Sequence, residues 1–220
     1  MKCKACLPLL LALGSFAACA GETPAEPDNG EPTQAWIRTV LVVGPSSADQ
    51  RVEAAREAVQ HWNGKFADLG LSQPFGTVGF LRQEIQEDLL ATYSRSVLEQ
   101  EAPPPTSNAF TAVAADVVIA LSDSAIISFA APLGGSGRSL VGIRTDRIPP
   151  LSLPNVPRNL VAHELGHVLG LGHNSDPTKL MCGRPAACRP AAFESDEPRF
   201  FPLTDSERDR LVQLHGEGGL

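Results

Sequence analysis

Residues 163–181 read HELGHVLGLGHNSDPTKLM, and this stretch places the strongest constraint on what the chain can build. The residues before it carry a helix-start signal, so we expect a helix from Asn155 to about Leu169. Within that helix His163 and His167 stand four residues apart, one turn from each other on the same face. This spacing brings two imidazole rings close enough to bind one metal ion.

Three further residues complete a candidate zinc site. Glu164 follows His163 directly, so its carboxylate borders the ion without binding it and can take a proton from a metal-activated water. Gly170 permits the backbone conformation in which a chain leaves a helix, and His173 then returns as the third ligand. Structural zinc sites usually have four protein ligands, whereas three histidines beside a glutamate indicate one catalytic Zn²⁺.

The stretch from His163 to Met181 resembles the matrixins, the matrix-metalloproteinase-like branch of the metzincins. In that family the third histidine is usually followed by Ser-x-Asp-Pro-x-Ala-Leu-Met. Here Asn174 stands in place of the serine, and Asp-Pro and Leu-Met follow at the family's spacing. The resemblance covers about residues 36–216. It implies a metzincin catalytic domain, zinc endopeptidase activity and a Met-turn in which Met181 forms a floor beneath the metal.

The chain also departs from the matrixin pattern in ways that limit what can be transferred. Matrixins follow the Met with a Pro-x-Tyr wall of the substrate pocket, and Cys182-Gly183-Arg184 replaces that wall here. Cleavage preference therefore cannot be carried over. Matrixin loops also hold a second zinc, but His61 and His215 are the only other histidines, so a single zinc is expected.

Hydrophobic patterning predicts an α/β fold over a domain spanning residues 35–217. Apolar and β-branched runs predict strands, and steps of three and four residues predict helices. The strands are expected at 36–43, 76–81, 116–121, 125–131 and 139–144, and the helices at 46–69, 84–100, 155–169 and from 204 onward. Strands separated by helices indicate a mixed, mostly parallel sheet, with 125–131 as an antiparallel edge strand. Thr204 and Glu207 form a capping box for the last helix.

The N-terminus predicts export. Residues 1–19 combine a short positive start with an apolar run too short to span a bilayer, as in a bacterial export signal. Cleavage after an A-x-A site would release the protein, whereas residues 16–19 resemble a lipobox, in which Cys19 becomes a lipid-modified N-terminus. The Pro-, Gly- and Glu-rich residues 20–34 predict a disordered tether. A tether directly after Cys19 favours a lipid anchor at the cell envelope over free secretion.

Cys182 and Cys188 are the only cysteines beyond this leader. An isolated pair in an exported protein favours a disulfide bond, with zinc ligation or two free thiols as the alternatives. The pair directly follows Met181, so a bridge would hold the segment where matrixins have their pocket wall.

We therefore expect a monomeric extracellular metalloprotease that acts on protein or peptide substrates. The net charge of −7 and the lack of a Lys/Arg cluster argue against nucleic acid as a partner, and a membrane partner is expected only through the lipid anchor. Two other functions stay open: a surface lipoprotein that uses the fold as a binding module, and a zinc hydrolase acting on something other than peptides. Loss of a histidine or of Glu164 would have favoured the binding module, and all are present.

Overall fold

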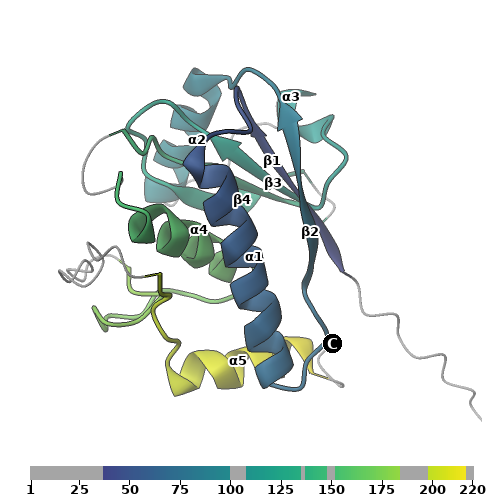
Figure 1. Ribbon diagram of the computed structural model, residues 1–220, viewed down its shortest axis with the longest axis vertical. Helices are drawn as coiled ribbons and strands as arrows, with labels where there is room; N and C mark the ends of the chain where they lie inside the picture. Colours follow the sequence, from purple (N-terminus) through teal and green to yellow (C-terminus); the bar gives the residue numbers. More distant parts are fainter. Residues whose placement is uncertain (1–36, 100–107, 135–136, 148–151, 184–197, 217–220) are drawn as a thin grey trace, which may run out of the picture. The chain divides into compact units, whose positions relative to one another are not determined.

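In the described part of the chain, five strands form one sheet in the order β2-β1-β3-β5-β4. Figure 1 shows the sheet together with the helices that pack on it. The structure is a computed structural model that describes residues 37–99, 108–134, 137–147, 152–183 and 198–216. The strands are β1 (Arg38–Gly44), β2 (Phe75–Arg82), β3 (Val117–Leu121), β4 (Phe129–Pro132) and β5 (Ser139–Ile143); the helices are α1 (Gln50–Asp68), α2 (Glu87–Glu99), α3 (Asn108–Thr111), α4 (Asn155–Val168) and α5 (Asp205–His215). Among the described helices, none has the length and apolarity that a membrane crossing requires.

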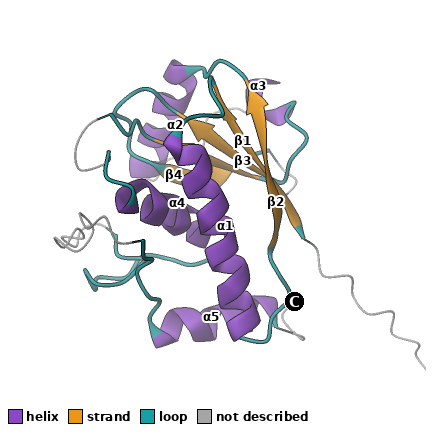
Figure 2. Ribbon diagram, in the orientation of Figure 1, coloured by secondary structure: helices purple, strands orange, loops and turns teal. Residues whose placement is uncertain are grey.

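The strand directions confirm the predicted fold class. β1 lies parallel to β2 and β3, and β3 lies parallel to β5. β4 pairs antiparallel with β5, from Phe129 opposite Gly142 to Pro132 opposite Ser139. The molecule is thus a mixed α/β protein with a mostly parallel sheet and an antiparallel edge strand (Figure 2).

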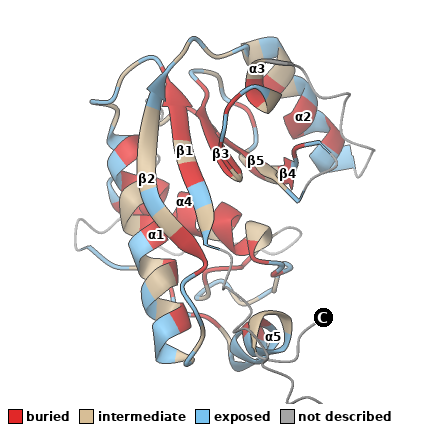
Figure 3. Ribbon diagram, turned by 90° about the vertical axis from the view of Figure 1, so that its right-hand side faces the viewer, coloured by how far each residue is buried: buried red, intermediate tan, exposed pale blue. Residues whose placement is uncertain are grey.

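Helices cover both faces of the sheet, which explains why β3 is buried throughout. Val117, Ile119 and Leu121 face the core beneath α1 and α4, whereas Val118 and Ala120 face a second core beneath α2 and α3. Successive side chains of a strand point to opposite faces, so a strand covered on both sides is apolar at every position. Figure 3 shows these buried strands between the two helical layers.

Helix α1 lies along the sheet on the side that carries the candidate site. The sequence predicts an apolar stripe on this helix, because apolar residues recur in steps of three and four from Val52 onward. The stripe is confirmed from Val52 to Phe66, and Trp62 within it is fully buried. Ser46 and Ser47 stand at the start of the predicted helix 46–69 and were expected to provide its cap, but neither does. Asp49 is the N-cap, because its carboxylate accepts a hydrogen bond from the Arg51 backbone N–H.

The edge strand is shorter than predicted: residues 125–131 were expected and Phe129–Pro132 is observed. Ser94 of α2 explains the late start. Its hydroxyl donates to the Ile127 carbonyl at 2.8 Å and accepts from the Ile127 N–H at 3.0 Å. The backbone at Ile127 therefore bonds to a helix side chain instead of to β5.

The sequence has apolar residues at steps of four over the predicted helix 84–100, and this series is confirmed in part. Tyr93 is buried, and Ile85 and Leu89 pack against the same core. Val97 is exposed, and Leu90 is buried instead. Each step of four residues rotates about 40° past a full helical turn, so a strict four-residue series drifts off the buried face. The short α3 was not predicted; it brings Phe110 into the core beneath α2.

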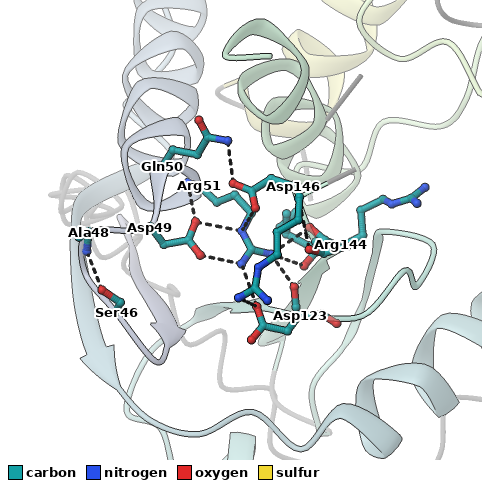
Figure 4. Close-up of polar contacts among 12 residues, drawn as sticks. Ser46, Ala48, Asp49, Gln50, Arg51, Asp123, Arg144 and Asp146 are labelled. Atoms are coloured by element: carbon teal, nitrogen blue, oxygen red, sulfur yellow. Dashed lines mark hydrogen bonds and ion pairs between the residues drawn. The ribbon is translucent and has the colours of Figure 1, made fainter. Parts of the chain in front are cut away.

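A buried arginine ties α1 to the carboxyl ends of β3 and β5 (Figure 4). Arg51 is 1% exposed and donates to the carbonyl oxygens of Ser122 at 2.6 Å and Arg144 at 2.9 Å. Its guanidinium also pairs with Asp49 at 2.6 Å, and with Asp123 and Asp146 at 3.9 Å each. Burial opposes ionisation of Asp49, but the bonds from Arg51 hold the pKa of that carboxyl below its usual range.

We expect Arg51→Met to destabilise the protein by about 3–5 kcal/mol, because the change leaves buried carbonyls and a carboxylate without their cation. Arg56→Met is the matched control. Arg56 is a partly exposed residue of the same helix that pairs only with Glu53 among the ion pairs of the described residues, so its loss should cost no more than about 0.5 kcal/mol. Urea unfolding of both variants measures the difference, and equal midpoints would contradict the structural role of Arg51.

The predicted leader 1–19, the tether 20–34 and the lipidation residue Cys19 lie outside the described residues, and so does Cys188. These assignments stay predictions.

Candidate metal centre

Helix α4 carries the first two histidines and is held firmly against α1. The indole N–H of Trp62 donates to the carbonyl oxygen of Ala162 at 2.9 Å, directly before His163. One turn earlier, Arg158 forms a two-point ion pair with Glu57, at 2.6 and 2.9 Å. The helix that presents His163 is therefore fixed by buried polar contacts as well as by apolar packing.

The third histidine returns to the helix after a tight exit. Gly170 has φ of 88°, a conformation that strongly favours glycine, so the chain can turn directly after α4. His173 then comes back beside His163 and His167. The structure thus brings together all three predicted ligands, which form the one group of potential metal ligands found among the described residues.

The three Nε2 atoms converge on one point. His163 and His167 are separated by 3.1 Å at Nε2, His163 and His173 by 3.2 Å, and His167 and His173 by 3.0 Å. Nitrogens bound tetrahedrally to a single zinc at about 2.0–2.1 Å lie about 3.3–3.4 Å apart. The triangle therefore needs to open by only a few tenths of an ångström to hold that ion.

The hydrogen bonds of the Nδ1 atoms determine which nitrogen of each histidine ring carries the hydrogen. Nδ1 of His163 lies 2.8 Å from the Leu180 carbonyl oxygen, and Nδ1 of His167 lies 2.8 Å from that of Leu171. A carbonyl can only accept, so each Nδ1 carries the hydrogen and each neutral ring directs the Nε2 lone pair at its neighbours. Converging lone pairs repel one another, whereas a cation between them is bound by all three. The donor set fits zinc.

Burial keeps two of these rings in the form that binds metal. Loss of solvent lowers the pKa of His167 below its ordinary 6.5, although the bond to Leu171 opposes part of the shift. Although His173 is the most exposed of the three, partial loss of solvent around its ring also lowers its pKa. Neutral imidazole is the ligand form, so both shifts favour metal binding near neutral pH.

Residues 180–183, the Met-turn, contact the site at several points. Leu180 accepts the hydrogen bond from His163, as described above. Met181 is fully buried, and its sulfur lies closest to the place where a Cβ on Gly166 would stand. Gly166 lies between the two histidines of α4, so Met181 packs against the helix that carries them.

Gly183 fits directly against the third ligand. A Cβ at this position would meet the ring of His173 at a separation well below 3.0 Å, closer than real Cβ atoms approach. In the sequence, Gly183 was notable only as part of the segment that replaces the matrixin pocket wall. The structure shows that a side chain there would displace His173.

We expect Gly183→Ala to weaken zinc binding by about 10–100-fold, the range typical for loss of a group that orients a metal ligand. Gly172→Ala is the control. It lies next to His173 on the other side, and nothing lies within 4 Å of its Cβ position. Competition with a chromogenic chelator measures both affinities. A Gly183→Ala variant that binds zinc like the wild type would show that His173 can move without consequence.

Glu164 is 5% exposed and lies on α4 directly after the first ligand. The cluster of potential metal ligands contains the three histidines without it, in keeping with a role other than ligation. Cys182 takes part in a disulfide bond. Its partner is outside the described residues, so pairing with Cys188 stays a prediction.

The remaining histidines have contacts of their own. His61 is one position off the apolar stripe of its helix, so the sequence predicts that it faces solvent. Its ring instead stacks on Phe200 with the centroids 4.2 Å apart, and its Nε2 is buried. Burial lowers the pKa of His61 to about 4, so this ring is neutral. Nε2 of His215 lies 3.0 Å from the Leu169 carbonyl oxygen.

No family model matches the chain, and no curated protein sequence matches it. Among solved structures, the chain is similar to an archaemetzincin from Methanopyrus kandleri, with 15% identity and a TM-score of 0.44 over 83% of this chain and 97% of that one. It is also similar to a zinc-dependent peptidase from Methanocorpusculum labreanum, with 14% identity and a TM-score of 0.40 over 78% of this chain and 99% of that one.

Proposed function

We propose that the protein is a zinc-dependent endopeptidase of matrixin-like type. The observation that carries the proposal is the convergence of three Nε2 atoms within 3.2 Å of one another, on rings whose Nδ1 atoms are held by carbonyls at two of the three positions. Three neutral ligands leave one tetrahedral position open, which is typical of catalytic zinc.

His163, His167 and His173 would hold a zinc ion, which would polarise the scissile carbonyl and activate a water for attack on it. Glu164 would accept a proton from the attacking water and donate it to the leaving amine. Glu164 directly follows the first candidate ligand, His163, on α4. Because Glu164 is only 5% exposed, its side chain is largely shielded from bulk water.

The substrate would bind as an added strand along β4. Within the described residues β4 is the edge of the sheet, with β5 on one side and no strand on the other. Helix α4 packs against β4, which puts this open edge beside the histidine helix. A peptide in extended form can hydrogen-bond to such an edge through its backbone, largely independent of its sequence.

Peptides blocked at both ends test the endopeptidase mode. The zinc-loaded protein should cleave them at internal bonds, and mass spectrometry should identify one new amine and one new carboxylate per cut. Cleavage only of peptides with a free end would indicate an exopeptidase. Zinc binding without turnover of any peptide would favour the binding module.

The proposal includes export and attachment to the cell envelope through Cys19. The leader pattern of residues 1–19 supports it, and so does the disulfide bond at Cys182, because such bonds persist in oxidising compartments.

A further inference from the structure

Asn174, directly after the third histidine, connects the metal centre to the last helix. Its backbone is held by the Met-turn: the Asn174 N–H donates to Met181 at 2.9 Å, and its carbonyl accepts from Gly183 at 3.1 Å. Its side-chain amide donates to Glu207 of α5 at 2.6 Å and accepts from the backbone N–H of Asp176 at 2.8 Å. Four hydrogen bonds therefore fix the residue adjoining His173.

The orientation of the Asn174 amide follows from its partners. A carboxylate can only accept and a backbone N–H can only donate, so Nδ2 must face Glu207 and Oδ1 must face Asp176. Both ends of the amide are in use, and neither a hydrocarbon nor a carboxylate at this position satisfies both partners.

Glu207 is itself fixed on α5. It is 7% exposed, and its second carboxylate oxygen accepts from the Thr204 N–H at 2.7 Å, as part of the capping box. A hydrogen bond to a poorly hydrated carboxylate is stronger than one between neutral groups. The Asn174–Glu207 contact thus joins the loop of the third ligand to the start of a helix.

We infer that Asn174 is a positioning residue that, through Glu207, holds His173 in the geometry needed to bind zinc. Among the three ligands His173 is the exposed one and the one that lies outside α4. Its position depends on the loop that follows it, and Asn174 is the residue of that loop with bonds to both the Met-turn and α5. The inference rests on the zinc site of the proposed function and adds the residue pair that maintains it.

Asn174→Asp tests this directly. The new carboxylate faces that of Glu207 at hydrogen-bond distance, so the two repel and the loop moves. We expect zinc affinity, measured by competition with a chromogenic chelator, to fall by about 10–100-fold. The d–d spectrum of the cobalt-substituted protein should also change, because it reports ligand geometry.

The double variant Asn174→Asp/Glu207→Gln should restore both readouts. In it the new amide at 207 donates to the new carboxylate at 174, while its oxygen still accepts from Thr204 and the carboxylate still accepts from Asp176. The amide and the carboxylate have exchanged positions, so every hydrogen bond of the pair is again possible. If Asn174→Asp acted only by destabilising the whole fold, the second substitution would not restore zinc affinity or the cobalt spectrum.

Thr204→Ala separates helix stability from metal binding. It removes the hydroxyl that accepts from the Glu207 N–H, so it weakens the cap while leaving the Asn174–Glu207 bond in place. We expect a lower thermal midpoint with unchanged zinc affinity. The inference is overturned if Asn174→Asp binds zinc like the wild type, if the double variant stays as weak as the single one, or if Thr204→Ala loses as much affinity. Failure of the wild type to bind zinc at all would instead remove the proposed function.

Discussion

Glu164→Gln is expected to lower kcat/KM for peptide hydrolysis by about 100- to 10,000-fold while leaving the zinc content unchanged. The substitution keeps the shape of a side chain that is 5% exposed and removes only its ability to take up a proton. Because Glu164 is not one of the three ligands, the histidine geometry should persist. Steady-state kinetics on a blocked peptide, together with metal analysis of the same sample, measures both quantities.

The outcome separates the role of base from that of ligand. A variant that loses zinc together with activity would make Glu164 part of the metal shell or of its support. Near-normal turnover would remove it from the mechanism altogether. Glu57→Gln is a useful comparison, since it changes a glutamate that pairs with α4 through Arg158 and lies outside the histidine cluster.

Alanine at His163, His167 or His173 should remove most of the bound zinc from the purified protein. Only two ligands remain in each variant. Zinc affinity should therefore fall by more than the roughly 10–100-fold that follows from removing a residue that only hydrogen-bonds to a ligand. Activity should fall with the zinc. Metal analysis after dialysis against a weak chelator measures the stoichiometry, which should be one per chain in the wild type.

His61→Ala and His215→Ala are the controls for this series. Both histidines have ring or carbonyl contacts outside the triad, so each variant should keep one equivalent of zinc even if its stability changes. Two tightly held equivalents in the wild type would contradict the expectation of a single zinc.

Much of the fold could be predicted because its signals are local. The buried stripe of α1 repeats at helical spacing, and the capping box at Thr204 and Glu207 is a four-residue pattern. The errors come from contacts between distant residues. Ser94 of α2 bonds to the backbone at Ile127 and delays the edge strand, and no local pattern indicates a partner 33 residues away.

The metal centre likewise has a part that could be predicted from the sequence and a part that could not. His163 and His167 are four apart on one helix, so their convergence follows from helical geometry, and His173 follows from the resemblance of the stretch to a known pattern. The residues that support the ligands could not be predicted. Gly183 matters because the ring of His173 lies where its Cβ would stand, and Asn174 matters because its side chain bonds to Glu207 of α5. Neither contact can be read from the local sequence.

The central claim is that peptide hydrolysis depends on a zinc ion held by the three histidines. The most direct test is digestion of a denatured protein mixture by the purified protein, first with excess chelator and then after chelator removal and addition of one equivalent of zinc. We expect cleavage to stop with the chelator and to return with zinc, and to be nearly absent in Glu164→Gln under all conditions. Cleavage that continues in the chelator, or a zinc-loaded wild type that leaves every protein in the mixture intact, would contradict the claim.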